Sequence, residues 1–88
     1  MKLHYLPSVG EGYVSDRVGY RVHDTTRIRG VVVVLGRESV DGRETNWFVA
    51  VYDHEGHRVP GSGSRSTPSV EQARDVYDAY VNGRRRAA

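Results

Sequence analysis

Apolar and polar residues alternate most regularly from residue 17 to residue 23, which predicts a strand with one buried face. The polar triplet 24–26 (Asp-Thr-Thr) is typical of a turn. Residues 27–35 predict a second strand. Its β-branched run at 31–34 is apolar on both faces, so this strand should lie near the middle of a sheet.

Residues 45–52 predict a third long strand, which contains Trp47. The polar stretch 36–44 connects it to the second strand, with Asp41-Gly42 as the turn signal. After a further turn at 53–56, shorter elements are expected. They are a brief return strand at 57–59 before Pro60, a flexible glycine- and serine-rich connector at 61–66, and a short edge strand at 2–6 before a loop at 8–12.

A C-terminal helix is predicted by its end signals and by its apolar stripe. Thr67 is a suitable N-cap, Pro68 suits the first helical position, and Asn82-Gly83 is a stop signal. Helical spacing puts six apolar residues on one face and several polar residues on the opposite face. The apolar six are Val70, Ala73, Val76, Tyr77, Tyr80 and Val81, and the polar face carries Glu71, Gln72, Asp75 and Asp78.

These elements predict an α+β fold. A small antiparallel sheet of three to five strands should pack one face against a single C-terminal amphipathic helix. The 88 residues suffice for one domain with its own core, expected over residues 1–83, followed by a basic tail at 84–88.

Composition excludes several classes of protein. The chain has no cysteine, which rules out a disulfide scaffold, a thiolate zinc site and a cysteine nucleophile. The apolar run at 31–35 is too short to cross a bilayer, and Pro7, Gly10 and Glu11 interrupt any signal-peptide core. We therefore expect a cytoplasmic protein that does not bind membranes.

The sequence lacks the residue patterns of catalysis. Its serines cluster at 61–69, in a connector that could not hold a nucleophile against a base, and no lysine follows the glycines as in a phosphate-binding loop. His54 and His57 beside Asp53 could share a metal ion, but the same residues suit a hairpin turn, which is the favoured interpretation. We expect no enzyme activity, no cofactor and no metal.

Charge is the more informative property. The net charge is +2, and 12 of the 13 basic residues are arginine, which suits bidentate phosphate contacts but is also the composition that a GC-rich genome produces. If Val22 pairs with Ile28 across the 24–26 turn, Arg21 faces Arg29 and His23 faces Arg27. Such like-charge pairs cost about 0.2–1 kcal/mol each, which contacts to phosphate would offset. The alternative is that these side chains are simply solvated or paired with carboxylates.

Residues 44–82 resemble the arm-type, AP2-like DNA-binding domains of tyrosine integrases. The resemblance rests on the strand 47–53, then Gly56 and Arg58, then the helix that opens with Thr67, Glu71 and Ala73 and continues through Tyr77 and Tyr80. It implies a three-stranded sheet placed in the major groove, with Trp47, Val49 and Val51 as sheet positions and Arg58 as a candidate contact. The run at 61–66 is similar, more distantly, to the loop before the last helix of double-stranded-RNA-binding domains.

The main functional prediction is a nucleic-acid-binding module, for DNA before RNA, that uses an arginine-rich sheet face. The residues expected to contact the backbone are Arg17, Arg21, Arg27, Arg29 and Arg58. The acidic outer face of the helix would repel phosphates, whereas the arginines at 84–86 could attract them or simply favour the helix end.

The alternative is a small inhibitor or accessory protein of a mobile element, directed against host defence. It would bind an acidic protein surface through arginines and through Tyr5, Tyr13, Tyr20, Tyr52, Tyr77 and Tyr80. A homodimer formed by pairing of strand 31–35 or 45–52 is a further possibility.

Overall fold

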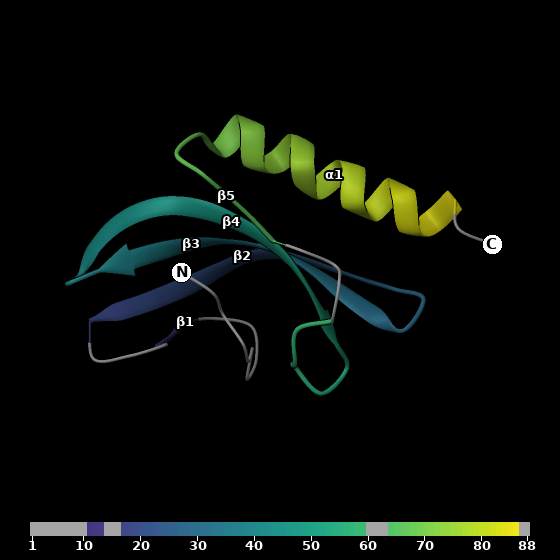
Figure 1. Cartoon of the computed structure of the whole chain (residues 1–88), viewed down its shortest axis with the longest axis horizontal. Coiled ribbons are helices and arrows are strands. Elements are labelled where there is room, and N and C mark those ends of the chain that lie inside the picture. Colours follow the sequence, from purple (N-terminus) through teal and green to yellow (C-terminus); the bar gives the residue numbers. More distant parts are fainter. Residues whose placement is uncertain (1–10, 14–16, 60–63, 87–88) are drawn as a thin grey trace.

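A computed structural model describes residues 11–13, 17–59 and 64–86. They form one antiparallel sheet whose strands are neighbours in chain order, with a single helix after the last strand (Figure 1). The predicted α+β class, with the helix on one face of the sheet, is confirmed. The elements are β1 (Glu11–Tyr13), β2 (Val18–Ile28), β3 (Val31–Val40), β4 (Arg43–Asp53), β5 (Ser64–Thr67) and α1 (Val70–Arg86).

The turn predicted at 24–26 is wrong, because β2 runs through it as a single strand. Thr25 and Thr26 are β-branched residues, which favour strands, and they pair with β3. The pairing register shifts between Val22 and Asp24, as at a β-bulge, so the strand continues past these polar residues. The chain reverses instead at Arg29-Gly30, where both residues have positive φ (48° and 82°), as a tight two-residue hairpin requires.

The stretch 36–44 is not a loop. β3 continues to Val40 and β4 begins at Arg43, so only the predicted Asp41-Gly42 turn separates them, and that turn is confirmed with positive φ at both residues. Two short strands also overlap stretches predicted as loops: β1 begins within 8–12 and ends at Tyr13, and β5 begins within the connector 61–66 and ends at Thr67. The edge strand predicted at 2–6 lies outside the described residues.

Both faces of the sheet carry buried apolar side chains. β3 is buried on both faces through residue 36 and is the middle strand of the sheet, as its β-branched run predicted. On the side of α1, the helix-side core contains Val31, Val33, Leu35, Val49, Val51, Ala73, Tyr77 and Val81. On the opposite side, the helix-free cluster contains Tyr20, Val22, Val32, Val34, Phe48, Ala50 and Tyr52.

α1 begins later and ends later than predicted. Ser69 is the cap, because its hydroxyl accepts a hydrogen bond from the Gln72 amide (3.3 Å) and its carbonyl accepts one from the Ala73 amide (3.0 Å). Thr67 belongs to β5. Gly83 does not adopt the positive φ of a C-cap, so the helix passes the predicted stop and the arginines at 84–86 form its last turn rather than a tail.

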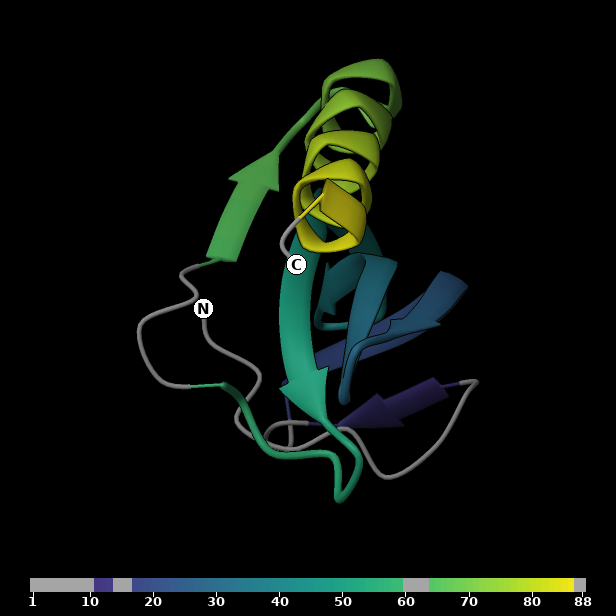
Figure 2. The same cartoon turned by 90° about the vertical axis from the view of Figure 1, so that its right-hand side faces the viewer.

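Two polar contacts join α1 to β2 beside the helix-side core. Arg74 Nη1 donates to Asp24 Oδ2 (2.8 Å), and the hydroxyls of Thr26 and Tyr77 are hydrogen-bonded to each other. The predicted polar face of the helix is exposed, and so is Val70 at 42%. Figure 2, which looks along α1, shows β5 beside the helix and β1 at the far side of the sheet. Within the described residues, no helix is long and apolar enough to cross a membrane.

Candidate nucleic-acid interface

The five arginines selected from the sequence do not share one surface. The pairing on which their selection depended is wrong, because Val22 lies opposite Gly36 and Ile28 lies opposite Val31. Arg21 and Arg27 are therefore on the same strand, and Arg29 is in the turn at its end.

Arg17 is occupied by an internal ion pair. Its Nε and Nη2 donate to the two carboxylate oxygens of Asp41, at 3.0 and 2.9 Å. This bidentate contact raises the pKa of the Arg17 guanidinium and lowers the pKa of the Asp41 carboxyl. The Asp41 amide also donates to the Arg17 carbonyl (2.7 Å), so Arg17 fixes the turn between β3 and β4.

Arg27 and Arg58 lie on the side of the sheet away from α1. Arg27 is opposite Val32 of the helix-free cluster, and its Nη1 is 3.5 Å from His54 Nδ1. The backbone of Arg58 forms an isolated antiparallel β-bridge with Tyr52, and the Arg58 guanidinium lies 5.8 Å from the centre of the Tyr52 ring. These two arginines therefore cannot contact the same ligand surface as Arg21.

Arg21 is on the same side of the sheet as α1 and faces another arginine. Arg21, Arg37, Trp47 and Thr67 are successive cross-strand partners over β2, β3, β4 and β5. Trp47 packs at the margin of the helix-side core. The guanidinium of Arg37 lies 4.9 Å from the Trp47 ring centre, and the His23 ring lies 4.8 Å from it at an interplanar angle of 60°. We call Arg21, His23, Arg37 and Trp47 the Trp47 surface.

Neighbouring groups hold Arg37 in place against the indole. Its Nε and Nη2 both donate to the Thr45 carbonyl (3.3 Å each), and its Nη1 is 3.6 Å from Glu44 Oε2. Arg37 keeps 29% of its side chain exposed, and Arg21 and His23 are exposed. The Trp47 surface thus presents two guanidiniums and an exposed imidazole beside one aromatic ring, all on adjacent strands.

Sequence reasoning missed Arg37 as a site residue because it placed 36–44 in a loop. The Asp41-Gly42 signal was sufficient to predict a two-residue hairpin, and a hairpin extends strands on both sides of its turn. The irregularity in β3 pairing between Arg37 and Ser39, which brings Arg37 opposite Trp47, carries no such signal.

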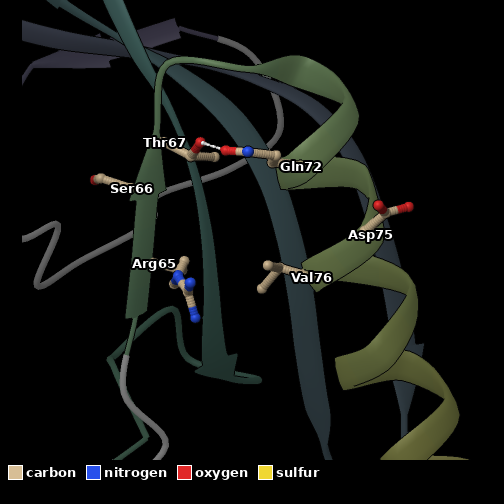
Figure 3. A pocket seen from close by; sticks show the side chains of 6 residues that line it. All are labelled: Arg65, Ser66, Thr67, Gln72, Asp75 and Val76. Carbon is tan, nitrogen blue, oxygen red and sulfur yellow. Dashed lines mark hydrogen bonds between the residues drawn. The ribbon is translucent and has the colours of Figure 1, made fainter.

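A groove lies between β5 and α1 (Figure 3), and Thr67, which lines it, is the cross-strand partner of Trp47. It has a volume of about 430 Å³ and is lined by Arg65, Ser66, Thr67, Gln72, Asp75 and Val76. A hydrogen bond from Thr67 Oγ1 to Gln72 Oε1 (2.6 Å) crosses its upper end. Arg65 is two residues from Thr67 along β5 and hence on the same side of the sheet, so it adds a third guanidinium on the side of the Trp47 surface.

The histidine-rich turn after β4 is organised by one carboxylate. Asp53 Oδ1 accepts hydrogen bonds from the amides of Glu55 (2.9 Å) and His57 (3.0 Å), and Asp53 O accepts one from the Gly56 amide (3.1 Å). This is the geometry of a hairpin turn. In the part of the chain that the structure describes, no group of three His, Cys, Asp or Glu side chains could hold a metal ion.

We expect this turn to be sensitive to acid. The hydrogen bond from the His57 amide is the largest cause of the lowered pKa of Asp53. A lowered folded pKa stabilises the turn above the unfolded value of about 3.9, and this contribution is lost as the pH falls through the folded value. NMR titration should show one transition that the Glu55 and His57 amide shifts share, with a midpoint below the ordinary aspartate value of about 3.9. Asp53→Asn, which keeps the acceptor oxygen, should abolish that titration, and a midpoint above the ordinary value would contradict the assignment.

The positions implied by the integrase resemblance are divided between the two sides of the sheet. Val49 and Val51 are buried in the helix-side core, whereas Arg58 is on the opposite side, where the helix-free cluster is buried too. Comparison of the chain with models of protein families, with curated proteins and with solved structures found no match. The functional argument therefore depends on the geometry of the chain itself.

Proposed function

We propose that this protein is a non-enzymatic nucleic-acid-binding module that engages its ligand through the Trp47 surface. The observation that carries the proposal is the direct cross-strand pairing of Arg21 with Arg37, next to an aromatic ring. Two like charges opposite each other destabilise a sheet by about 0.2–1 kcal/mol, and part of this cost is offset here because Glu11 is the β1 partner of Arg21 and Glu44 Oε2 lies 3.6 Å from Arg37 Nη1. A phosphate between them makes charge-assisted hydrogen bonds that more than offset this cost.

The mechanism is positional rather than chemical. Arg21 and Arg37 would contact backbone phosphates, with Arg37 already oriented by Thr45 and by the Trp47 ring. The exposed His23 ring and the outer plane of the Arg37 guanidinium, both already in contact with the Trp47 ring, would offer stacking partners to bases. DNA in the cytoplasm remains the proposed partner and location.

The alternative of a tyrosine-rich protein interface has less support. Tyr20, Tyr52 and Tyr77 are each at most 4% exposed and belong to the two apolar clusters, so they are core residues. These three of the six tyrosines therefore do not form an interaction surface, and Tyr5 lies outside the described residues. Capture of a stoichiometric protein partner without nucleic acid would nevertheless replace our proposal with this one.

Fluorescence anisotropy with labelled DNA and RNA fragments tests the proposal. Arg21→Ala combined with Arg37→Ala should weaken binding about tenfold or more and lower the slope of log affinity against log salt by about 1 to 2. The matched control, Arg27→Ala combined with Arg29→Ala, makes the same change in net charge away from the Trp47 surface. It should weaken binding less than about threefold.

Two results would contradict the proposal. One is equal loss of affinity in both double variants, which would show that only net charge matters. The other is absence of binding to any DNA or RNA fragment at roughly 50 mM salt, where phosphate contacts are strong.

A further inference from the structure

We infer that the ligand of the Trp47 surface is a single strand with unstacked bases, not a duplex. This inference rests on the proposed function and names its substrate class. It is carried by three features of the described residues, namely the position of Trp47 beside the helix, the charges on that helix, and the line of basic and aromatic groups across the strands.

Trp47 is partly buried beside α1. Its cross-strand partner Thr67 is followed within three residues by the first residue of the helix, Val70, and the indole packs against the helix-side core. A helix with its side chains is about 10–12 Å across, so α1 forms a wall next to this row of residues. In Figure 1, the β3–β4 hairpin extends beyond the start of α1.

A duplex is less suited than a single strand to a surface bordered by α1. Its persistence length is about 150 base pairs, so bending it sharply around the start of α1 would cost deformation energy. A single strand has no such constraint, because its backbone and bases rotate independently. The position of Trp47 beside α1 therefore favours a flexible, single-stranded nucleic acid.

The acidic side chains of α1 also disfavour a duplex. Glu71, Asp75 and Asp78 are exposed on α1. A duplex carries one negative charge for about every 1.7 Å of its axis, and a duplex lying over the Trp47 surface would bring part of that charge against these carboxylates. A single strand can follow the arginines and avoid the acidic face.

The line of favourable groups matches a short strand. From Arg21 to Thr67 it crosses β2, β3, β4 and β5, and a strand spacing of about 4.8 Å gives a path of roughly 14 Å. Arg65 extends the path by one further cation, and the path should end there because Asp75 also lines the β5–α1 groove. Aromatic faces bind bases of any sequence only when those bases are unstacked from a helix. The site should hold a few nucleotides with little sequence preference.

The single tryptophan of the chain provides the test. Oligodeoxythymidine of about 12 nucleotides should quench Trp47 fluorescence and bind at least about tenfold more tightly than a mixed-sequence duplex of about 12 base pairs. Labelled-oligonucleotide anisotropy should show that Trp47→Phe weakens single-strand binding about two- to tenfold without changing the salt slope. The Arg21/Arg37 double variant should change that slope. Circular dichroism verifies that both variants remain folded.

The outcomes separate the two proposals. Equal or tighter binding of the duplex would overturn the single-strand inference and leave nucleic-acid binding intact. Single-strand binding that neither quenches Trp47 nor responds to Trp47→Phe would also overturn it, because the strand would then lie elsewhere. Failure of both probes to bind would overturn the proposed function and the inference together.

Discussion

Replacement of Gly36 by alanine is expected to lower the free energy of unfolding by about 3 kcal/mol, at the upper end of the usual cost of overpacking a core. A Cβ at this position would lie 2.6 Å from two atoms of the Phe48 ring and 2.7 Å from the backbone oxygen of Arg21. Phe48 is held by an edge-to-face contact with Tyr20, and a backbone oxygen in a sheet has no freedom to withdraw. The strands themselves would have to separate.

The measurement is urea unfolding followed by circular dichroism, with Gly83→Ala as the matched control. Gly83 lies in α1, and a Cβ added there would meet no heavy atom within 4 Å in the described structure. Alanine should therefore stabilise that variant by roughly 0.5–1 kcal/mol, because glycine is a poor helix former. Equal effects of the two glycine substitutions would show that the close approach of β2, β3 and Phe48 is not as described.

Truncation of Leu35 to alanine is expected to cost about 2–5 kcal/mol. Leu35 is fully buried in the helix-side core, between Asp24 of β2 and Val49 of β4 in the sheet, and under α1. Its removal leaves a cavity at the contact between sheet and helix, and neither layer can collapse into it without disturbing the other.

The control for this variant is Val70→Ala, which also shortens an aliphatic side chain. Val70 is 42% exposed at the start of α1, so its truncation should change the free energy of unfolding by less than about 0.5 kcal/mol. Thermal and urea unfolding of both variants would measure these changes in the free energy of unfolding. A loss below about 1 kcal/mol for Leu35→Ala would mean that α1 does not pack on this face of the sheet.

Several elements were predictable because their signals are local. The β-branched run at 31–34 predicted the central strand, Asp41-Gly42 predicted a hairpin turn, and the apolar stripe predicted the buried face of α1. Each signal depends on a property of a few adjacent residues, such as rotamer restriction, tolerance of positive φ, or helical spacing.

The errors came from polar residues with more than one structural use. Asp24 followed by two threonines was interpreted as a turn, but Asp24 accepts hydrogen bonds from its neighbour's amide (2.9 Å) and from Arg74 of α1 (2.8 Å), which lets it remain in a strand. Asn82-Gly83 was interpreted as a stop, although glycine also fits inside a helix. Contacts distant in sequence decide between such uses, and periodicity does not reveal them.

The sequence by itself determined the class of fold, the middle strand, the buried face of the helix and the excess of arginine over lysine, because these follow from residue chemistry and short-range spacing. Only the tertiary structure decided which arginines share a surface. Strand register sets the side chains that face each other, and a shift of one residue reverses the side to which they point. The hairpin turn at Arg29-Gly30, rather than at 24–26, therefore separated Arg21 from Arg29 and brought it opposite Arg37, beside Trp47.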